Sequence, residues 1–370
     1  MYSIRLSPVR WVTYCVQPEG LILVKAYRML AWKTSPEYRD VPQPEPGPGQ
    51  VLVKVAAAGL CHSDLHVIHE FDAGVFNADL PFTLGHENAG WVEALGLGAT
   101  GLEIGQPVAV YGPLGCGRCA HCSTGDENIC DRLAELPGAG WGLGVDGGLA
   151  EYMLVDRVRQ LVPLGDLAPS LAAPLTDAAV TPYRAIRRSL DVLTPGSTAV
   201  VLGVGGLGHL AVQILQALCP ATVIAVDAKP EARAFALTLG ANHVVAPGPD
   251  ATAEILELTK GRGVDLTLDL VGADSTLALA FAIARAGSRI ALVGAAGGSA
   301  TYNFWATKFE VQLSTSIWGS ITDLRDVIAL AERGLLTPKV TTYSFDRIPE
   351  AFRALEGGTL EGRAVILPHG

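Results

Sequence analysis

Hydrophobic and polar positions follow different patterns on the two sides of residue 170. Before that point, short apolar runs alternate with segments rich in glycine and proline; examples are VLVKVAAAG (51–59), GWVEALG (90–96), PVAVYG (107–112) and AEYMLV (150–155). Short apolar runs with such punctuation are typical of strands joined by turns. We therefore expect residues 25 to about 160 to form a mainly antiparallel, barrel-like unit with functional loops between its strands.

Longer elements alternate after residue 170. The stretch 171–190 has helical periodicity, and TAVVLGVGGLGHLAVQILQALC (198–219) predicts a strand, a glycine turn and a long helix. Continued strand–helix alternation predicts an α/β fold with a parallel, doubly wound sheet. The further elements are the strands TVIAVD (222–227), HVVA (243–246), VDLTLDLVG (264–272), RIALVG (289–294) and EGRAVILP (361–368), a helix that stops at Gly240, and the helical LRDVIALAERG (324–334).

Composition is consistent with about two folded domains. The chain has 370 residues, and its hydrophobic fraction of 49% argues against a disordered protein. A formal net charge of −10 and the lack of a basic block argue against a nucleic-acid partner. No apolar run reaches the ~18 residues that a membrane helix needs. These signals favour a cytoplasmic protein.

Residues 1–23 do not continue the pattern of the rest of the chain. The polar stretch QPEG (17–20) interrupts their apolar patch, and no small-residue cleavage site follows a continuous hydrophobic run, so we do not expect a secretory signal. The regular pattern begins at Val24, and we expect the native chain to start there. A floppy extension is the alternative, and we assign this segment no function.

The sequence GVGGLG places glycines at 203, 205 and 208 in the pattern G-x-G-x-x-G. With 42 glycines in the chain the pattern alone is weak, but a β-branched run precedes it, an amphipathic helix follows, and Asp227 ends the next strand 19 residues after Gly208. Gly203 would permit the turn, Gly205 would let a pyrophosphate approach the backbone, and Gly208 would let the helix pack closely. Asp227 would bind the adenosine ribose and repel a 2′-phosphate, which favours NAD over NADP, although Lys229 weakens this preference. A tight turn without ligand is the alternative.

Four of the seven cysteines lie in one short loop. Cys116, Cys119, Cys122 and Cys130 have the spacing C-x2-C-x2-C-x7-C. In a reducing cytosol, clustered cysteines bind metal more often than they form disulfides. Four thiolates can surround one Zn²⁺ and leave no open ligand position, so we expect a structural zinc that organises this loop. An iron–sulfur cluster is the rival occupant, and we interpret His121 as a bystander.

A second set of metal-ligand side chains is divided among three segments. AGLCHSDLH (58–66) contributes Cys61 and TLGHENAG (83–90) contributes His86, and both residue types bind zinc well. A set completed by Asp177 would leave a fourth position for water or substrate, as catalytic sites do. Taken singly, Cys61 could be a core thiol, His86 a loop histidine and Asp177 a charge at a helix N-terminus. Sequence separation alone does not join them.

GHE (85–87), the four-cysteine loop, GVGGLG and the downstream aspartate together resemble the zinc-dependent medium-chain alcohol dehydrogenases. The resemblance covers residues 25–370 and is nearest to bacterial secondary-alcohol dehydrogenases with aspartate as third zinc ligand. It implies a Rossmann fold for the doubly wound sheet and a GroES-like fold for the barrel-like unit. It also implies a catalytic domain of residues 24–178 and 320–370 and an NAD-binding domain of residues 179–319.

The same resemblance assigns metal-site roles. It makes Cys61, His86 and Asp177 the ligands of a catalytic zinc, although the family more often has cysteine at the third position. Glu87 matches a carboxylate that can approach the zinc, and Asp64 matches the group that orients the histidine ligand. The four loop cysteines match the structural zinc site, which gives two zinc ions per chain.

Further positions match the proton relay, cofactor site and substrate pocket of that family. Ser63 would take the alcohol proton, and His66 would pass it to solvent, a task that suits an imidazole near neutral pH. The matching cofactor positions surround the glycine turn and the nicotinamide: His62, Thr181, Gly203, Gly205, Gly206, Leu207, Gly208, Asp227, Lys229, Val293, Ile317 and Arg363. The pocket candidates are hydrophobic or aromatic: Leu136, Trp141 and Trp318, with Phe71 or Phe76 as additions.

These roles imply reversible hydride transfer between NAD and a secondary or primary alcohol, hydrophobic or benzylic in character. The expected partners are small molecules, without nucleic acid or membrane, and a homotetramer is expected ahead of a dimer, formed through the edge of the nucleotide-binding sheet. Three alternatives stay open: a polyol or formaldehyde-type zinc dehydrogenase, a zinc-free quinone or enoyl reductase, and a non-enzymatic NAD-binding protein. The retained zinc-ligand residues count against the zinc-free reductase.

Overall fold

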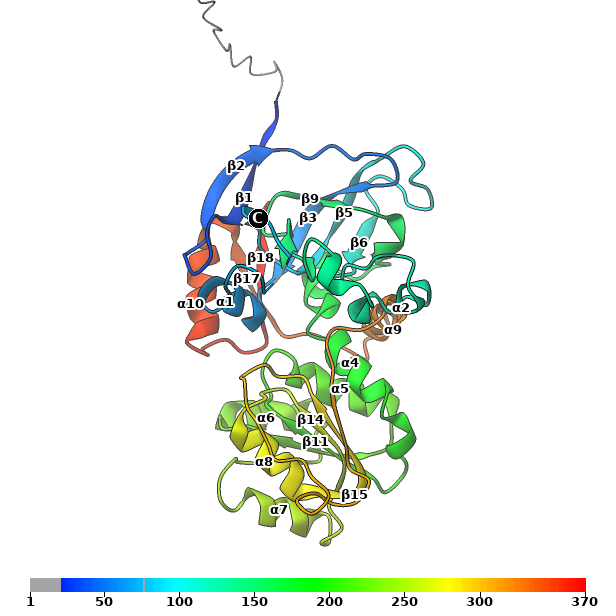
Figure 1. Cartoon of the computed structure of the whole chain (residues 1–370), viewed down its shortest axis with the longest axis vertical. Coiled ribbons are helices and arrows are strands. Elements are labelled where there is room, and N and C mark those ends of the chain that lie inside the picture. Colours follow the sequence, from blue (N-terminus) through cyan, green and yellow to red (C-terminus); the bar gives the residue numbers. More distant parts are fainter. Residues whose placement is uncertain (1–20, 76) are drawn as a thin grey trace, which may run out of the picture.

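The computed structural model describes residues 21–75 and 77–370, which are arranged as two units (Figure 1). Most of the segment 1–23 and the pocket candidate Phe76 lie outside the described residues. No helix in the described part of the chain combines the length and the hydrophobicity needed to cross a membrane.

The first unit is built on a seven-stranded sheet. Its central strand β3 (Val51–Gly59) pairs antiparallel with β5 (Glu87–Leu95), β9 (Tyr152–Val155) and β18 (Arg363–Leu367). The strand order is β10-β6-β5-β3-β18-β17, with a parallel β17–β18 pair. The predicted mainly antiparallel unit is therefore confirmed. Its other strands are β6 (Pro107–Val110), β10 (Leu161–Pro163), β17 (Val340–Ser344), the three-stranded sheet of β1 (Leu23–Met29), β2 (Glu37–Pro42) and β4 (Phe82–Thr83), and the pair β7 (Gly140–Trp141) and β8 (Gly144–Val145).

The C-terminal strand returns to the first unit. Ile366 in β18 pairs with Ala58, and Gly59 pairs with Glu87, so the start of β18 lies near the end of β3. Because β17 and β18 belong to this sheet, we propose that residues 320–370 form one domain with residues 24–178, and that residues 179–319 form the other. The helices of the first unit are α1 (His62–His69), α2 (Ala120–Ser123), α3 (Pro169–Ala172), α9 (Ile321–Glu332) and α10 (Ile348–Glu356).

The second unit is a six-stranded sheet whose strand pairs are all parallel. Its order, β13-β12-β11-β14-β15-β16, is the doubly wound arrangement 3-2-1-4-5-6, which confirms the predicted sheet. Ligands of such sheets bind at the carboxyl ends of the strands where the order reverses, here between β11 and β14. The elements are β11 (Thr198–Leu202), β12 (Thr222–Val226), β13 (His243–Val245), β14 (Val264–Asp269), β15 (Ala284–Leu292), β16 (Gln312–Thr315), α4 (Val180–Arg187), α5 (Gly208–Leu218), α6 (Pro230–Thr238), α7 (Ala251–Leu258) and α8 (Asp274–Ile283).

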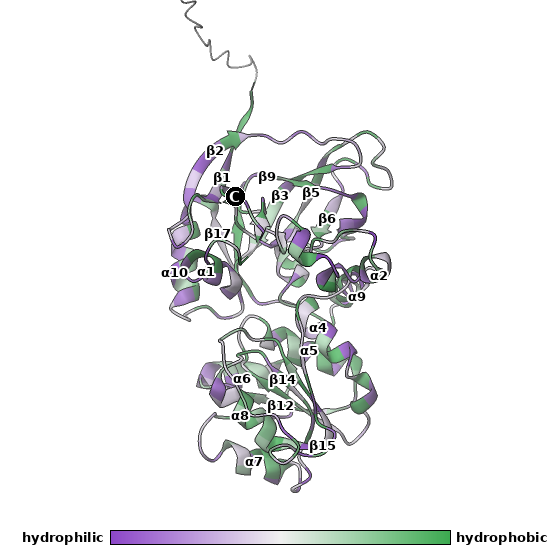
Figure 2. Ribbon diagram, in the orientation of Figure 1, coloured by the Kyte–Doolittle hydropathy of each residue, from purple (hydrophilic) through white to green (hydrophobic). Residues whose placement is uncertain are grey.

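The central strands of this sheet are hydrophobic because helices cover both faces. Every residue of β11 and β14 is buried, and green is the commonest colour inside the sheet, although polar residues interrupt β14 (Figure 2). Full burial of a valine, leucine or isoleucine side chain contributes about 1.5–3 kcal/mol. The rigid sheet therefore provides a fixed base for the loops at its carboxyl edge.

The stretch 171–190 is not one continuous helix, contrary to its periodicity. α3 continues into a 3₁₀ turn over Ala173–Thr176, and α4 begins at Val180. Asp177 lies in the break with φ −136° and ψ −61°, outside helical geometry. The apolar spacing continues through the break, so the pattern gave no sign of it. The break frees the Asp177 side chain from a helix surface.

Candidate active site and metal centres

The turn after β3 carries the first potential metal ligand. Cys61 caps α1, and its backbone N–H donates to Oδ2 of Asp64 at 2.9 Å. Oδ1 of the same buried carboxylate lies 3.0 Å from Nδ1 of His86. Because an ionised carboxylate only accepts, Nδ1 of His86 carries a proton, and a metal bound at the cluster would take the place of any proton on Nε2. This geometry supports the orienting role predicted for Asp64.

Four potential ligands from distant parts of the chain meet at one point. The ligand atoms of Cys61, His86, Glu87 and Asp177 all lie within 4.8 Å of one another. Oδ2 of Asp177 is 3.7 Å from Cys61 Sγ and 3.6 Å from His86 Nε2. Nε2 of His86 and Oε2 of Glu87 are buried and have no hydrogen-bond partner among the described residues. Buried polar atoms rarely stay unpaired, so this donor set fits a zinc ion.

The charges around the cluster favour ionised ligands. Burial opposes the ionisation of Cys61 and Asp177, but His86 and Arg363 outweigh it and lower the pKa of both groups. Burial, with the charges of Cys61 and Asp177, raises the pKa of Glu87 although Arg363 pairs with it. Since zinc binds deprotonated ligands, these directions favour Cys61 and Asp177 over Glu87 as ligands.

Arg363 connects the cluster to the glycine turn. This buried guanidinium forms an ion pair with Glu87. Glycine at position 59 leaves room for the Glu87 carboxylate, because a Cβ there would collide with Oε2 of Glu87. Nη1 of Arg363 lies 2.5 Å from the position that a Cβ of Gly206 would occupy. Its Nε is buried without a partner among the described residues. A permanent charge with a spare donor beside a glycine turn fits a phosphate group.

The glycine turn joins β11 to α5 with little room for side chains. Gly203 has a φ of +90°, which residues with a Cβ rarely adopt. A Cβ at Gly208 would collide with the carbonyl oxygen of Gly203, so α5 can pack closely only with glycine there. No atom lies within 4 Å of the Cβ position of Gly205, so a ligand can reach its backbone. The turn therefore fits a pyrophosphate at the start of α5. Leu207 is the N-cap residue of this helix.

Asp227 follows β12 at the same edge of the sheet. Its Oδ2 accepts from the Val204 N–H at 2.7 Å and its Oδ1 from the Lys229 N–H at 2.8 Å. Each oxygen keeps a second lone pair that can accept from a ribose hydroxyl. The Lys229 ammonium group donates to the Gly358 carbonyl of the first unit. This contact directs the lysine charge away from the Asp227 carboxylate.

The four loop cysteines also meet at one point. Their Sγ atoms lie within 4.8 Å of one another, and the Cys116–Cys122 and Cys119–Cys130 separations are 3.9 Å, far beyond a disulfide of about 2.05 Å. Backbone N–H groups, led by that of Arg118, lower the pKa of Cys116 to about 6, whereas burial raises that of Cys122 to about 12. A bound cation would let all four groups ionise to thiolates at this short separation. The set fits one zinc ion without an open position.

Trp318 forms a wall beside the first cluster. Its buried indole lies edge-on to the His86 ring, with centroids 6.2 Å apart and an interplanar angle of 78°. A Cβ at Gly112 or Gly140 would crowd the indole, so both glycines make space for it. The Trp318 backbone is left-handed, with a φ of +45°. Such a conformation persists only where the surroundings hold it.

The cysteine loop holds the segment that carries Trp318. Asn128 donates through Nδ2 to the Ile317 carbonyl at 2.9 Å, and the Gly125 carbonyl accepts from the Ile321 N–H at 3.0 Å. Figure 1 shows α2 of the cysteine loop beside α9, the helix that starts at Ile321. The four-cysteine loop thus contacts the segment that carries Trp318, the residue beside the Cys61 cluster.

The predicted relay residues lie on α1. Ser63 Oγ is 3.8 Å from Cys61 Sγ, and His66 Nδ1 is 2.8 Å from Oε2 of Glu70. The Glu70 side chain is 63% exposed and that of His66 is 25% exposed, so the His66–Glu70 pair reaches solvent. The His66 ring stacks on Phe71 at 6.3 Å. These positions suit proton transfer between the cluster and solvent.

Two further predicted residues lie close to the first cluster. Thr181 donates through Oγ1 to Oδ1 of Asp177 at 2.9 Å. His62 starts α1, and its partial burial together with the charges of Arg363 and His66 lowers its pKa. Thr181 thus contacts the cluster directly, whereas His62 is the chain neighbour of Cys61.

Among the described residues, no hydrogen bond or ion pair joins the remaining candidates to the Cys61 cluster. Trp141 lines a cavity of about 390 Å³ together with residues of β1 and β2, none of them from the Cys61 cluster. Leu136 is half-buried, the Ile317 side chain is 56% exposed, and the Val293 N–H is bonded to the Asp269 carbonyl.

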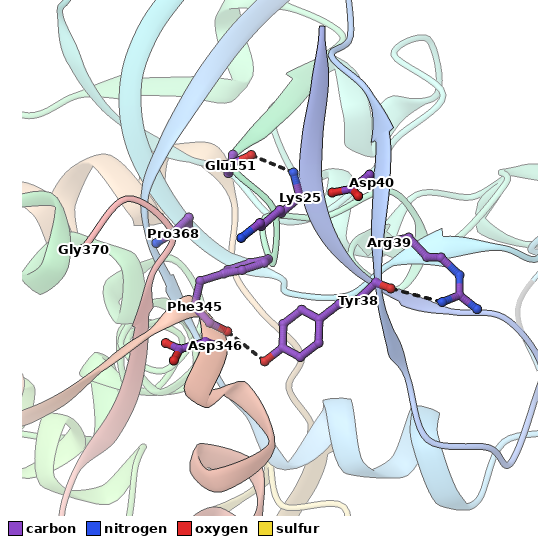
Figure 3. A pocket seen from close by; sticks show the side chains of 9 residues that line it. All are labelled: Lys25, Tyr38, Arg39, Asp40, Glu151, Phe345, Asp346, Pro368 and Gly370. Carbon is purple, nitrogen blue, oxygen red and sulfur yellow. Dashed lines mark hydrogen bonds between the residues drawn. The ribbon is translucent and has the colours of Figure 1, made fainter.

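A cavity of about 560 Å³ lies between β1, β2 and the C-terminus, where Lys25, Tyr38 and Glu151 are among the lining residues (Figure 3). His121 lies 3.6 Å from Asp131, outside the thiol cluster.

Three contacts at the site had not been inferred from the sequence. They are the Glu87–Arg363 ion pair, the Thr181–Asp177 hydrogen bond and a bond from the Lys339 backbone to His209. Only the Thr181 contact has a local signal, because it joins residues four positions apart. The other partners are 276 and 130 positions apart, and their residue types carry no sign of the pairing.

Comparisons with known proteins agree with this geometry. Residues 47–166 match the family model of the alcohol dehydrogenase GroES-like domain, and residues 206–333 match that of the zinc-binding dehydrogenases. A NAD-dependent alcohol dehydrogenase of Sulfurisphaera tokodaii is 38% identical, over 93% of this chain and 100% of that one. A D-arabinose 1-dehydrogenase (NADP(+)) of Saccharolobus solfataricus is 37% identical, over 95% and 100%. The crystal structure of the alcohol dehydrogenase from Aeropyrum pernix has a TM-score of 0.85 and 36% identity, over 93% and 100%.

Proposed function

The chain belongs to the zinc-dependent medium-chain alcohol dehydrogenase family, and on this premise we propose that it catalyses the reversible, NAD-dependent oxidation of an alcohol to its ketone or aldehyde. The meeting of Cys61, His86 and Asp177 beside Arg363 and the glycine turn carries this proposal. A zinc-ligand set next to a dinucleotide-binding turn is the arrangement that the reaction needs.

Cys61, His86 and Asp177 would hold the catalytic zinc, and the glycine turn with Arg363 would hold NAD. When bound, zinc supplies a Lewis acid for the substrate oxygen and NAD supplies the hydride acceptor. Asp64 keeps the His86 ring oriented through Nδ1, and Glu87 holds the guanidinium of Arg363 in place. The buried position of these groups excludes water from the reacting centre.

Ser63 and His66 would carry the proton that the alcohol loses. Ser63 Oγ accepts the hydroxyl proton and gives its own proton outward, and His66 passes a proton toward solvent. The contact of His66 with the exposed Glu70 supports this direction. Ser63 and His66 would therefore carry away the proton, while the hydride goes to the nicotinamide.

The cofactor proposal is NAD rather than NADP because Asp227 lies where the adenosine ribose binds in such turns. A 2′-phosphate there would meet the negative carboxylate, whose oxygens are already fixed by two backbone N–H groups. The Sulfurisphaera relative is named NAD-dependent, whereas the D-arabinose dehydrogenase is named for NADP(+).

We propose a secondary or primary alcohol of hydrophobic or benzylic character as the substrate. Trp318 beside His86, with Phe71 near the relay, supplies aromatic walls at the cluster. A sugar or other polyol is the second candidate, because one relative is named a D-arabinose dehydrogenase. The two sets of grouped zinc ligands count against a zinc-free quinone or enoyl reductase.

We expect purified protein to contain two zinc ions per chain and to form NADH from secondary and benzylic alcohols. The measurement is metal analysis together with NADH absorbance over a panel of secondary, primary and benzylic alcohols, a polyol and D-arabinose, each with NAD and with NADP. Because the Asp227 carboxylate would repel a 2′-phosphate, NADP should lower kcat/KM by about 10-fold or more. Chelation of the catalytic zinc should stop turnover. Preference for D-arabinose would move the proposal to the polyol class, and quinone reduction by zinc-free protein would contradict it.

A His66→Gln variant is expected to lose about 10-fold or more in kcat near neutral pH and to recover part of it at alkaline pH, where solvent takes the proton more readily. His69→Gln is the matched control, because His69 lies on the same helix with an exposed side chain, 4.0 Å from Glu356. The measurement is the pH profile of kcat for both variants. A His66→Gln profile that coincides with the control would remove His66 from the relay.

A further inference from the structure

His209, the residue after the last glycine of the turn, bonds both units of the protein. It is 1% exposed and lies in the first turn of α5. Its Nδ1 lies 2.9 Å from the carbonyl oxygen of Gly205, and its Nε2 lies 3.1 Å from the backbone nitrogen of Lys339. A backbone N–H can only donate, so Nε2 accepts and Nδ1 carries the proton that is donated to Gly205. The two contacts thus define one neutral tautomer.

The surroundings keep the His209 ring neutral. It stacks on Phe235 at 6.1 Å with an interplanar angle of 28°. Burial, followed by the positive charges of Arg363 and Lys339, lowers the pKa of His209 to about 4, against the bond to Gly205. At physiological pH the ring can therefore donate at Nδ1 and accept at Nε2 at the same time.

The Lys339 backbone continues this connection to Arg363. The Lys339 carbonyl accepts from the Arg363 N–H at 2.8 Å, where β17 and β18 begin side by side. The Arg363 side chain then reaches the Cβ position of Gly206. The contacts run from Gly205 through His209, Lys339 and Arg363 back to Gly206, which adjoins Gly205 in the chain.

We propose that His209 is a positioning residue for the dinucleotide, which holds the glycine turn of one unit and Arg363 of the other at a fixed separation. Both groups face the place where a pyrophosphate would lie, so a fixed separation lets them bind it together without an ordering cost. This inference rests on the proposed function, because it concerns the same cofactor. His209 acts through the Gly205 and Lys339 backbones and does not itself contact the reacting atoms.

Gln213, one helical turn further along α5, offers a matched control. Its Nε2 donates to the Thr337 carbonyl at 3.1 Å, and its Oε1 accepts from the Thr337 N–H at 2.9 Å. It therefore joins the same two units through the same connecting segment. Its Nε2 also donates to the backbone carbonyl of His209 at 3.0 Å, which is an ordinary contact within α5. Among the described residues its side chain makes no hydrogen bond to Gly205, Gly206 or Arg363, so its loss weakens the joint and leaves the His209 ring contacts in place.

The test compares His209→Phe, His209→Gln and Gln213→Leu in full-length, zinc-loaded protein. Phenylalanine keeps the ring and its stacking on Phe235 but removes both hydrogen bonds, whereas glutamine can still accept from the Lys339 N–H. We expect the Kd for NADH, measured by fluorescence titration, to rise about 10-fold in His209→Phe and less in His209→Gln, with KM for NAD rising in parallel. The kcat at saturating NAD and the Kd of Gln213→Leu should stay within about twofold of wild type.

Unchanged NADH affinity in a folded His209→Phe protein would overturn the inference. Equal weakening in Gln213→Leu would also overturn it, because the effect would then reflect the joint in general. If His209→Phe does not fold, His209→Asn takes its place with the same expected loss, since its side chain is too short to reach Lys339. Wild-type protein that binds no NADH would instead contradict the proposed function, so the two failures are distinct.

Discussion

Replacement of Cys61 by serine is expected to lower kcat/KM by about 10³-fold or more while NADH binding survives. A zinc ion at this cluster would supply several kcal/mol of stabilisation to the developing charge, and each 1.4 kcal/mol is worth about tenfold in rate. Serine cannot replace the thiolate, because its hydroxyl stays protonated near neutral pH and zinc binds deprotonated ligands. Metal analysis of the variant should give one zinc per chain instead of two.

Cys219→Ser is the control for this substitution. Cys219 is a half-buried free cysteine whose thiol contacts the Leu215 carbonyl at 3.2 Å, and it belongs to neither thiol cluster. This variant should keep both zinc ions and wild-type kinetics. A Cys61→Ser protein with two zinc ions and full activity would show that the Cys61 cluster is not the catalytic centre.

The third ligand is tested by two changes at Asp177. Asp177→Cys should keep the zinc and stay within about 10-fold of wild-type activity, because a thiolate is a good zinc donor at this position. Asp177→Ala should lose the zinc and behave like Cys61→Ser. If Asp177→Ala retains zinc and activity, Glu87 becomes the third ligand, since it is the remaining carboxylate of the cluster.

The sheets of both units were predictable from sequence because their signals are local. β11 and β12 are apolar runs that each begin with a threonine, β14 alternates apolar and polar residues, and the glycine turn directly follows β11. The cysteine loop was predictable for the same reason, since its four thiols lie within fifteen positions, from Cys116 to Cys130. β16 and β17 were not predicted, because their exposed or half-exposed residues produce no apolar pattern.

The grouping of Cys61, His86 and Asp177 could not come from spacing alone. Cys61 and Asp177 are 116 positions apart, and only the fold brings their side chains to 3.7 Å. The family resemblance named them together, whereas the helix break that frees Asp177 was invisible in the periodicity. His209 illustrates the same limit, because a histidine in an amphipathic helix gives no sign of a partner on another unit.

Replacement of Cys119 by serine is expected to destabilise the protein strongly while the chemistry at the Cys61 cluster remains. Loss of a structural metal belongs to the largest class of single-residue effects, about 4 kcal/mol or more. For a chain of this size we expect the midpoint of thermal unfolding to fall by about 5–10 °C. Metal analysis should give one zinc per chain, and Cys219→Ser should again match wild type.

The Cys119→Ser protein should also reveal what the cysteine loop does for the active site. Asn128 and Gly125 of this loop hold the backbone on both sides of Trp318, whose left-handed conformation depends on such support. A loosened loop should therefore raise KM for bulky alcohols more than KM for NAD, at a temperature where the protein is still folded. Cys61→Ser should show the opposite pattern, with a large loss of kcat and little loss of stability. If the two variants lose stability and turnover in the same proportion, the Cys61 cluster and the four-cysteine loop do not have separate roles.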